Sequence, residues 1–517
     1  MASSRNALLL LGWAVVLSVA AWLRLADLGG KPIHADESVH AWKVGEMLDG
    51  GAHRYDPHEY HGPTLHYLGS IAARLSGETS SGELTIATLR LVPAATGVAL
   101  VAAALLLAPM LGARASLFAG AWTAVSPLQV YYSRHFIQEP LVVLTTLLSV
   151  SLGWLAIRRS SWRFALAAGC AFGLLVATKE TWLLVAAAAA PAIALASWPH
   201  RHALWRPDVL RNRLREAAAF IASTVFVTAF FYSAFFTDWD GLVDFVKGLV
   251  IGAGRSSGGV HDKPWWYYVQ FFLWNPTGGR NWTEGTILVF ALASLLLSRR
   301  RPRARPSVEA SGRIFWLVYA GALAAAYSIV PYKIVWLALG FWHAAAVAAG
   351  AGTALAFRRT TRAVPRWALA GIVVAMLIHL GRNAHHAAVR APAHPRNPYA
   401  YVTTSSDALR LAPRLDAIAA VSPRGRELRI HVALEEYWPL PWLLRGFPNV
   451  GYWLGVPETW SSADVYLVSP EVYETMPTEL ADSLATEFFG LRDGTIVVLA
   501  APRDLWSASL PPPSSAP

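Results

Sequence analysis

The chain has 517 residues, of which 55% are hydrophobic and only 15% are charged. This balance leaves too little polar surface for a protein of this length in water, so the composition excludes an ordinary soluble fold and predicts a membrane protein. The formal net charge of +11 comes from arginines clustered in short segments between apolar runs, which is a topology pattern and not a nucleic-acid-binding surface.

Apolar runs rich in Ala, Leu and Val recur along the first three quarters of the chain, at lengths near the roughly 20 residues that cross a hydrocarbon core. The first run follows Arg5, and we interpret it as a retained span and not a cleaved signal peptide, because many more spans follow it. The sequence therefore predicts a polytopic α-helical membrane protein with about 11 transmembrane helices, at residues 7–26, 89–111, 115–130, 140–157, 164–178, 182–198, 217–236, 286–297, 314–330, 334–357 and 367–380.

The connectors between these runs alternate in charge, and this alternation predicts an orientation. Arginines cluster at residues 158–163, 201–215, 299–305 and 358–366, and Arg5 and Arg114 lie on the same side of the predicted spans. Because positive charge stays on the cytoplasmic side, these segments define the cytoplasm. We therefore expect a protein of the plasma (inner) membrane, with a cytoplasmic N-terminus and an extracytoplasmic C-terminus.

The remaining connectors then face outward. The transmembrane domain, residues 1–385, has a first outer loop at 27–88, a large outer loop at 237–285, and short outer connectors at 131–139, 179–180 and 331–333.

Beyond Gly381 the composition becomes mixed polar and apolar with regular turn signals, so a soluble domain is predicted at residues 386–510. A helix is expected at 405–420, and the Val and Ile content predicts strands at 428–434, 465–468 and 495–500. The sequence thus predicts a small C-terminal α/β domain outside the membrane, followed by a disordered Pro/Ser tail at 511–517.

Two adjacent carboxylates, Asp36 and Glu37, follow the first apolar run by a few residues. An ionised oxygen near a reacting hydroxyl can act as a general base or bind a metal ion, and a site at the membrane surface suits a substrate anchored in lipid. The alternative is a pair of solvated loop acids, and the density of Asp, His and aromatic residues around them weighs against it. Both are candidate catalytic residues.

The outer connector Tyr131–Glu139, with the sequence YYSRHFIQE, places Arg134 at the bilayer edge, where unpaired charge is costly. An outward-facing arginine runs against the orientation rule, which favours a specific anion partner such as a phosphate. The alternative is an arginine that snorkels beside an aromatic belt. Tyr132, His135 and Glu139 of the same connector are candidate substrate-lining residues.

Two further connectors carry an outward-facing cation with almost no loop around it. Lys179 and Glu180 form either an internal ion pair or a phosphate contact with its own counter-charge. Lys333, which has no neighbouring acid in sequence, either snorkels or binds a lipid phosphate. We take Arg134, Lys179 and Lys333 as candidate phosphate-binding residues, and Glu180 as a residue that lines the substrate site.

Residues 34–67 hold six of the 16 histidines, including His34 and His61. They suggest zinc by their number, but their spacing matches no compact motif such as HExxH, so a structural metal is only a weak alternative and we interpret them as solvated or substrate-lining residues. Trp265 belongs to an aromatic cluster after the glycine-rich Ser256–Gly259 segment, where it either stacks on a sugar or anchors at the membrane interface. No Walker loop or dinucleotide fingerprint occurs, so an activated nucleotide donor is unsupported.

These motifs together resemble the polytopic glycosyltransferases of the GT-C class, in which an acidic pair after the first span is followed by an amphipathic outer loop and an Arg-x-x-x-x-acid motif. The chain is most similar to prokaryotic proteins related to dolichyl-phosphate-mannose protein mannosyltransferases, including the archaeal family known as flippase-activity-associated. The stretches that carry the resemblance span nearly the whole chain and are HADESVHAW (34–42), RYDP (54–57), YHGP (60–63), YYSRHFIQE (131–139), ATKE (177–180), PYKIVW (331–336) and WPLPWLLR (438–445).

The resemblance implies a GT-C-like fold and transfer of a sugar from a polyprenyl-phosphate-linked donor, with inversion at the anomeric carbon. Asp36 would act as general base or orient the acceptor, with Glu37 beside it, and Arg134, Lys179 and Lys333 would be available for the donor phosphate. Glu139 stands where the mannosyltransferases have an aspartate. Some related enzymes need a divalent cation held by outer-loop acids, but this sequence has no evident Asp-x-Asp in its second outer loop. A divalent cation therefore stays open, and no metal ligand is assigned.

The function expected from the sequence is that of a membrane glycosyltransferase acting outside the membrane on a glycan, lipid or protein acceptor. Its partners would be a polyprenyl-phosphate sugar donor and membrane lipid, and no nucleic acid. Two rivals remain. The first is a lipid-linked sugar flippase or transporter component, in which the same cations guide a lipid phosphate without chemistry. The second is a non-catalytic glycan-binding membrane protein in which the spans are only an anchor.

Overall fold

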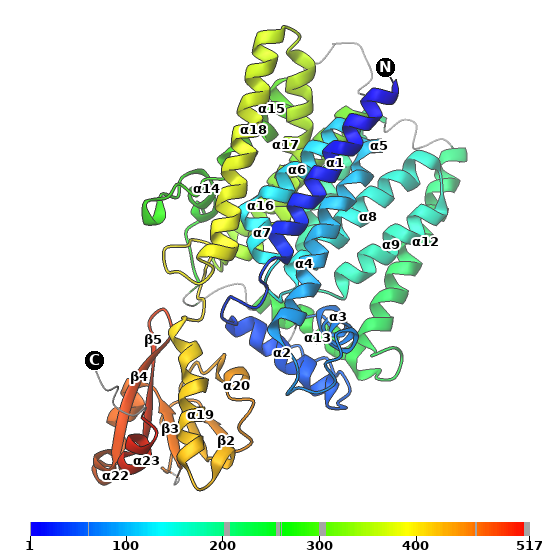
Figure 1. Ribbon diagram of the computed structural model, residues 1–517. Helices are drawn as coiled ribbons and strands as arrows, with labels where there is room; N and C mark the ends of the chain where they lie inside the picture. The colour runs from blue at the N-terminus through cyan, green and yellow to red at the C-terminus, as the bar shows by residue number, and fades with distance from the viewer. Residues whose placement is uncertain are drawn as a thin grey trace.

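A computed structural model gives the fold, and it describes residues 2–59, 61–200, 207–254, 259, 261–298, 307–460 and 463–510 (Figure 1). A bundle of helices forms the larger part, and a small sheet domain lies beyond one end of it (Figure 1). Several predicted features lie outside the described residues: Tyr60, most of Ser256–Gly259, the arginines of 299–305 together with Arg201 and Arg206, and the tail at 511–517.

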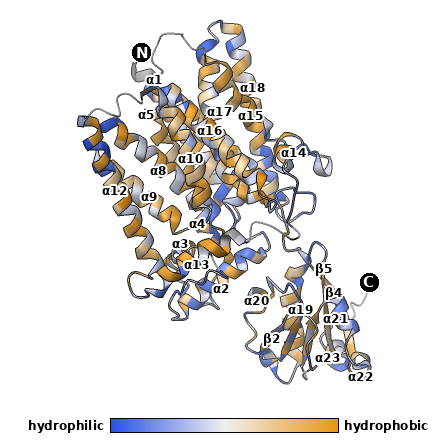
Figure 2. Ribbon diagram, turned by 180° about the vertical axis from the view of Figure 1, so that it is seen from behind, coloured by the Kyte–Doolittle hydropathy of each residue, from blue (hydrophilic) through white to orange (hydrophobic). Residues whose placement is uncertain are grey.

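The long helices of the bundle are mainly apolar, with hydrophilic residues gathered toward their ends (Figure 2). Within the described residues, seven helices are long and apolar enough to cross a membrane. A helix suits this setting because it satisfies its own backbone hydrogen bonds. The seven are α1 (Ala2–Leu25), α4 (Ile86–Ala103, continued by η1 at Ala104–Leu107 and α5 at Ala108–Leu111), α8 (Glu139–Arg159), α12 (Pro207–Tyr232), α16 (Val308–Ile329), α17 (Leu339–Arg359, preceded by η4 at Val335–Ala338) and α18 (Ala363–His385, continued by the π-helix η5 at His386–Arg390).

Four shorter helices belong to the same bundle: α6 (Ala113–Val125), α9 (Trp162–Val176), α10 (Trp182–Ser197) and α15 (Gly285–Leu296). Each of the eleven predicted apolar runs therefore coincides with a helix. Because seven of these helices have the length of a full span, the number of 11 crossings stays a prediction.

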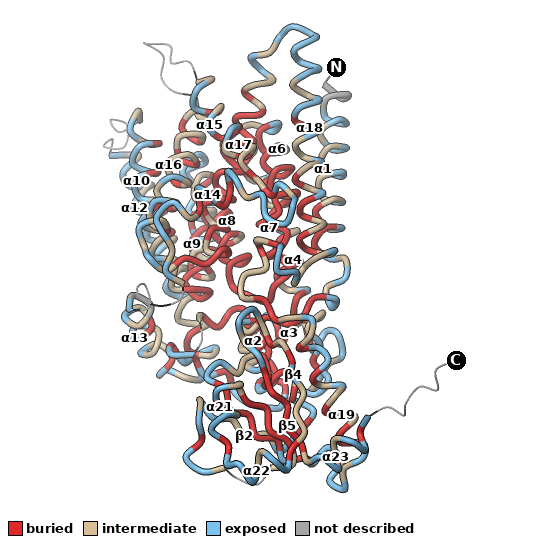
Figure 3. Tube along the Cα trace, turned by 90° about the vertical axis from the view of Figure 1, so that its left-hand side faces the viewer, coloured by how far each residue is buried: buried red, intermediate tan, exposed pale blue. Residues whose placement is uncertain are grey.

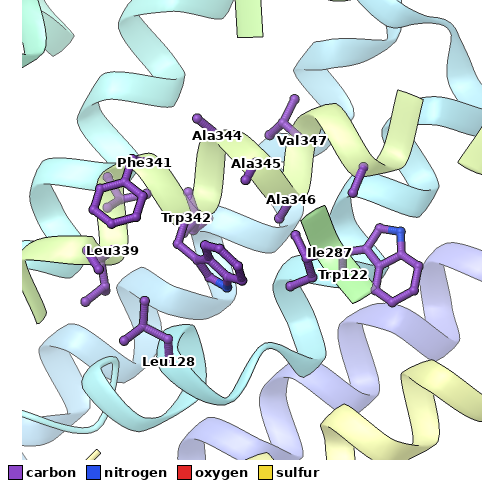
Figure 4. Packing of buried hydrophobic residues seen from close by; sticks show 14 of the residues in the cluster. Trp122, Leu128, Ile287, Leu339, Phe341, Trp342, Ala344, Ala345, Ala346 and Val347 are labelled. Atoms are coloured by element: carbon purple, nitrogen blue, oxygen red, sulfur yellow. The ribbon is translucent and has the colours of Figure 1, made fainter. Parts of the chain in front are cut away.

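Helix α17 lies inside the bundle, and 89% of its apolar window is buried, compared with 11% for α12 and α18 at the periphery (Figure 3). Small residues allow this central position. A Cβ on Gly350 would lie 2.3 Å from the Ala119 nitrogen of α6, and one on Gly352 would lie 1.8 Å from the Phe290 oxygen of α15. Close backbone approach is the usual basis of helix association in membranes. Trp122, Ile287, Trp342 and their neighbours fill the remaining space (Figure 4).

The two long loops that are predicted to face outward contain helices, most of which lie at the end of the bundle nearest the sheet domain (Figure 1). The first loop forms α2 (Ala35–Leu48) and α3 (Thr64–Leu75), and the second forms α13 (Asp240–Gly254) and α14 (Tyr267–Leu273). A further short helix, α7 (Pro127–Tyr132), precedes the Ser133–Gln138 turn. Helices α2 and α13 contribute to the wall of the candidate site.

The C-terminal domain contains a five-stranded mixed sheet with the order β2-β1-β3-β5-β4. Strands β1 and β2, and β1 and β3, are parallel, while β5 is antiparallel to both β3 and β4. The predicted small sheet domain with a helix near its start is present, although β2 and β4 were not expected from the sequence. The elements are α19 (Leu411–Val421), β1 (Ile430–Ala433), α20 (Leu440–Leu443), β2 (Val450–Trp453), β3 (Val465–Val468), α21 (Pro470–Glu474), α22 (Thr478–Ser483), β4 (Leu484–Arg492), β5 (Thr495–Pro502) and α23 (Arg503–Ala508).

The sheet domain is attached to the first outer loop by specific contacts. Thr404 donates a hydrogen bond to the Ile33 oxygen (2.5 Å), and the His34 ring lies 3.2 Å from the Tyr401 oxygen. Trp442 of α20 packs into the apolar cluster that includes Ile33 and Leu65. The WPLPWLLR motif therefore packs against α2 and the residues that precede it.

Candidate functional site

A cavity of about 510 Å³ lies between α2, the start of α8, the connector from α9 to α10, and the segment that joins α16 to α17. Tyr332, Ile334 and Trp336 form part of its wall. Its titratable lining residues are Asp36, His40, Glu59, His61, Glu139, Lys179 and Glu180. Five of these, namely Asp36, His61, Glu139, Lys179 and Glu180, are residues that the sequence proposed for the site.

Asp36 lies in the first turn of α2, and its side chain is 50% exposed. Its backbone N–H donates to Nδ1 of His34 at 3.1 Å, which caps the helix. Among the described residues, the only basic side chain within 4 Å of its oxygens is that same ring, 3.9 Å from Oδ1. The carboxylate is therefore available to a molecule in the cavity.

Glu37 has a different environment, although it is the next residue. It is fully buried, and Arg90 of α4 donates to both of its oxygens at 2.8 and 2.7 Å. The backbone N–H groups of His34 and Phe136 also donate to it, at 3.0 and 2.9 Å. Burial alone would raise the pKa of Glu37, but Arg90 and Lys31 hold it well below its usual range. Glu37 does not line the cavity, and its contacts fix the entry into α2.

Lys179 and Glu139 form a buried ion pair in the cavity wall. Glu139 begins α8, where the helix dipole favours an acid, and Lys179 lies in the tight turn after α9. An ammonium group has three N–H donors, and Glu139 is the only side-chain partner of Lys179 in the part of the chain that the structure describes. The second oxygen of Glu139 is buried without a hydrogen bond among those residues. The pair thus keeps donor capacity that a ligand can use.

Glu180 is held by two groups from the first outer loop. His61 lies 2.8 Å from its Oε2, and the Tyr55 hydroxyl donates to Oε1 at 3.3 Å. Burial would raise the pKa of Glu180, but the hydrogen bond from His61 and its charge lower it to about 2. Glu180 is therefore a carboxylate at neutral pH.

The segment that begins at His61 packs directly against the ATKE segment (177–180). A Cβ on Gly62 would lie 2.2 Å from the Ala177 oxygen, so only glycine fits there. Thr64 adds a hydroxyl contact of 2.8 Å with Thr178. This packing positions His61 and Lys179 on the same cavity.

Three histidines form a hydrogen-bonded chain that begins in α2. Gln138 lies 3.1 Å from Nε2 of His40, Nδ1 of His40 lies 3.0 Å from His66, and His66 lies 3.1 Å from His53. All three rings are buried, and burial lowers the pKa of His40 to about 3 and that of His53 to about 4. These neutral rings connect α2, α3 and the loop between them.

Two of the three predicted phosphate-binding cations do not line the cavity. The guanidinium of Arg134 binds the backbone oxygens of Leu23, Arg24, Ala26 and Asp27, at the end of α1. The ammonium of Lys333 is buried and donates to the backbone oxygens of Lys263, Val330 and Pro331. Burial lowers the pKa of both groups, that of Arg134 to about 10. Both satisfy orphan carbonyls at helix ends and in turns.

The other predicted lining residues lie behind the cavity or away from it. His34, Tyr132 and His135 are buried. His34 and Tyr132 each have their ring 5.6 Å from that of Trp336, which does line the cavity. His135 contacts Lys31 and the Tyr131 oxygen. Trp265 is 65% exposed and does not line the cavity.

Within the described residues, no group of three or more His, Cys, Asp or Glu side chains is placed to hold a metal ion.

Some residues that build the site were not predicted from the sequence. Arg90 was hidden inside an apolar run, although a lone arginine in such a run is itself a signal for a buried partner. Glu59, His40 and Tyr332 lay within matched motifs or next to them, and only the fold shows that they reach the cavity.

The fold and the cavity define an integral membrane protein in which a half-exposed carboxylate and a buried lysine line one cavity of a helix bundle that carries a small sheet domain beyond one end. Residues 60–232 match the family model described as dolichyl-phosphate-mannose-protein mannosyltransferase. A comparison with the curated proteins finds no match.

Solved structures share this fold over nearly the whole chain. ArnT from Cupriavidus metallidurans in the apo state superposes with a TM-score of 0.63 at 14% identity, over 98% of this chain and 100% of that one. The same protein bound to undecaprenyl phosphate gives 0.61 at 16%, over 98% and 99%. AglB from Archaeoglobus fulgidus, an archaeal oligosaccharyltransferase in complex with an inhibitory peptide and a dolichol-phosphate, gives 0.58 at 14%, over 98% and 77%. The predicted resemblance to GT-C glycosyltransferases is confirmed, and the likeness to these structures is one of fold.

Proposed function

We propose that this protein is a membrane glycosyltransferase that moves a sugar from a polyprenyl-phosphate-linked donor to an acceptor on the extracytoplasmic side. The observation that carries the proposal is one cavity lined by both an exposed carboxylate, Asp36, and a buried ammonium, Lys179. Sugar transfer from a lipid phosphate needs a base for the acceptor and a cation for the leaving phosphate.

In this proposal Asp36 is the general base. The acceptor oxygen attacks the anomeric carbon as the bond from that carbon to the phosphate oxygen breaks, and the acceptor proton moves to the Asp36 carboxylate. This single displacement inverts the anomeric centre and needs no covalent enzyme nucleophile. The half-exposed carboxylate can reach a hydroxyl in the cavity, whereas both oxygens of Glu37 are already bound by Arg90. We therefore assign the base to Asp36 and a positioning role to Glu37.

Lys179 is proposed to bind the donor phosphate. Its ammonium keeps unused donors beside Glu139, and a charge-assisted hydrogen bond to phosphate is stronger than a neutral one. His61 and Glu180 from the neighbouring segment complete this side of the cavity and are proposed to contact the sugar. We do not include Arg134 or Lys333 in the phosphate site, because backbone carbonyls occupy their donors.

The relatives support the lipid-linked donor. The ArnT structure holds undecaprenyl phosphate, and the AglB structure holds a dolichol-phosphate with an inhibitory peptide. The matched family model favours a mannose-like donor and a protein acceptor, which we propose as the first substrates to test. The proposed orientation places the domain of residues 386–510 outside the membrane, and a reporter fused after residue 386 would read as cytoplasmic if this orientation is wrong.

The test is sugar transfer by the purified chain from a synthetic polyprenyl-phosphate mannose, measured as release of polyprenyl phosphate. Asp36→Asn should lower the rate by roughly 10²- to 10⁴-fold, the usual contribution of a positioned general base, while donor binding is kept. Asp56→Asn is the matched control, because Asp56 is an exposed acid of the same loop that only caps the His58 N–H. Transfer by Asp36→Asn at the wild-type rate would refute the assignment, and lipid-linked sugar movement across vesicles without transfer would favour a flippase.

A further inference from the structure

A second cavity, of about 690 Å³, lies between α1, α6 and α18, and none of its lining residues lines the first cavity. Figure 1 and Figure 3 show α1 and α18 side by side at the periphery of the bundle. Its walls are Val15, Val19 and Trp22 of α1 and Val374, Leu377 and Ile378 of α18. The α1 residues are spaced by four and three positions, and the α18 residues stand at positions i, i+3 and i+4, so each set occupies one face of its helix. The small side chains of Ala121 and Ala124 of α6 form the floor.

The groove is open on the outer surface of the helix bundle. Val15 and Trp22 on one wall are 56% exposed, and Ile378 on the other is 57% exposed. In a membrane such a surface faces hydrocarbon, so the apolar part of the groove suits a lipid chain that enters laterally.

The end of the groove near the sheet domain is strongly basic. Arg280, Arg382 and Arg390 line it together with His385 and His386, and no carboxylate lines the cavity. Within the described residues, none of the three arginines has an acid within ion-pairing distance. Arg280 donates to Asn383 (3.2 Å) and lies over Trp282, while Arg382 and Arg390 have no hydrogen-bond partner there.

The groove is therefore apolar along α1 and α18 and cationic at the end near the sheet domain. Three arginines at an outer membrane interface run against the rule that positive charge stays inside, so their position calls for an anionic partner. Helix α18 also changes to a π-helix at His386–Arg390, the segment that holds part of this cluster, and π-turns are frequent at functional sites. Basic pockets between transmembrane helices are typical sites for anionic lipid headgroups.

We propose that this groove binds an anionic phospholipid, with its phosphate on Arg382, Arg390 and Arg280 and an acyl chain along α1 and α18. The chemistry favours a non-reacting lipid over the polyprenyl carrier, because neither Asp36 nor Lys179 lines this groove. The proposal does not depend on the glycosyltransferase activity. It depends on an apolar channel that ends in unpaired cations.

The proposed site predicts that the protein binds an anionic phospholipid more tightly than a zwitterionic one. The full chain, purified in a neutral detergent, is titrated with phosphatidylglycerol or phosphatidylcholine, and bound lipid is counted by native mass spectrometry. We expect phosphatidylglycerol to bind about tenfold more tightly or better, because each arginine near a phosphate contributes to affinity. A phosphatidylglycerol with a photoreactive acyl chain should label α1 and α18.

The variant pair Arg382→Gln and Arg390→Gln, made together, should reduce phosphatidylglycerol binding about tenfold or more and leave phosphatidylcholine unchanged. The control is Arg54→Gln with Arg74→Gln, which removes the same charge from the first outer loop, away from this groove. An unchanged melting temperature in phosphatidylcholine shows that the double variant is folded. If the double variant is unstable, each single variant replaces it in the titration, and we expect a smaller loss of phosphatidylglycerol binding. Equal binding of the two lipids, equal loss in the control, or exclusive retention of polyprenyl phosphate from an equimolar mixture would overturn the proposal.

Discussion

Removal of Arg90 should destabilise the protein strongly, because it leaves the carboxylate of Glu37 buried without its main counter-charge. Arg90 is 1% exposed and Glu37 is fully buried. Arg90 makes two hydrogen bonds to Glu37 and three more to the backbone oxygens of Leu28, Lys31 and Pro32. Loss of one partner of such a pair costs about 3–5 kcal/mol. We therefore expect Arg90→Met to lower the free energy of unfolding in detergent micelles by that amount.

The effect of a second substitution on stability distinguishes this electrostatic explanation from a simple loss of packing. Glu37→Gln in the Arg90→Met background removes the uncompensated charge. Its single amide oxygen can accept only one of the two N–H bonds, which His34 and Phe136 donate to different oxygens of Glu37, but the lost bond costs less than a buried unpaired charge. The double variant should therefore be more stable than Arg90→Met alone. Arg54→Met, at an exposed arginine of the first outer loop, is the control and should stay within about 0.5 kcal/mol of wild type. A cost below 1 kcal/mol for Arg90→Met, or a double variant less stable than the single one, would refute the reasoning.

Three further predictions concern the cavity walls. Gly62→Ala should cost about 1–3 kcal/mol in unfolding free energy and impair transfer, because its Cβ meets the Ala177 oxygen at 2.2 Å; Gly82→Ala, with open space around it, should do neither. Lys179→Gln should weaken binding of polyprenyl phosphate about tenfold or more in a direct titration, and an equal loss in folded Arg134→Gln would place the phosphate elsewhere. Acidification from pH 6.5 to 5 should destabilise the fold, because burial lowers the pKa of His40 and His53 to about 3 and 4. The unfolded chain then binds protons that the folded chain does not, so stability falls by up to about 1.4 kcal/mol per pH unit for each ring. His53→Gln should flatten this dependence in unfolding curves, and an unchanged slope would contradict it.

The helix bundle could be predicted because its signal is composition. A run of some 20 apolar residues becomes a helix in a membrane whatever it packs against, since nothing else satisfies its backbone. The missed elements have weaker signals. Strand β2 is short, half-buried, and contains Gly451, which is covered by the ring of Trp453. Strand β4 has no regular apolar alternation and includes Glu487, Gly490 and Arg492, and helices α2 and α3 lie in a segment that the sequence predicts to be an outer loop.

The cations of the site show where sequence reasoning stops. Lys179, Arg134 and Lys333 all stand in short connectors that are predicted to face outward, within matched motifs, and the sequence made each of them a candidate for the phosphate. The fold separates them by their acceptors. Lys179 pairs with the carboxylate of Glu139 in the cavity wall, while Arg134 and Lys333 bind carbonyl groups of helix ends and turns. Which carbonyls are left without a partner depends on where each helix ends in three dimensions, and no spacing in the sequence records that.

Asp36 and Glu37 show the opposite case, in which the sequence held a signal that could have separated them. Successive residues of a helix point about 100° apart, so two adjacent acids at the start of α2 point in different directions. His34 and Glu37 stand three residues apart, the spacing of a capping box, and in that motif the acid turns back to the N-cap backbone. Glu37 does so, and Arg90 then completes its environment. The capping geometry therefore directs one carboxylate into the protein and leaves Asp36 exposed to the cavity, which is why we assign the base to Asp36 alone.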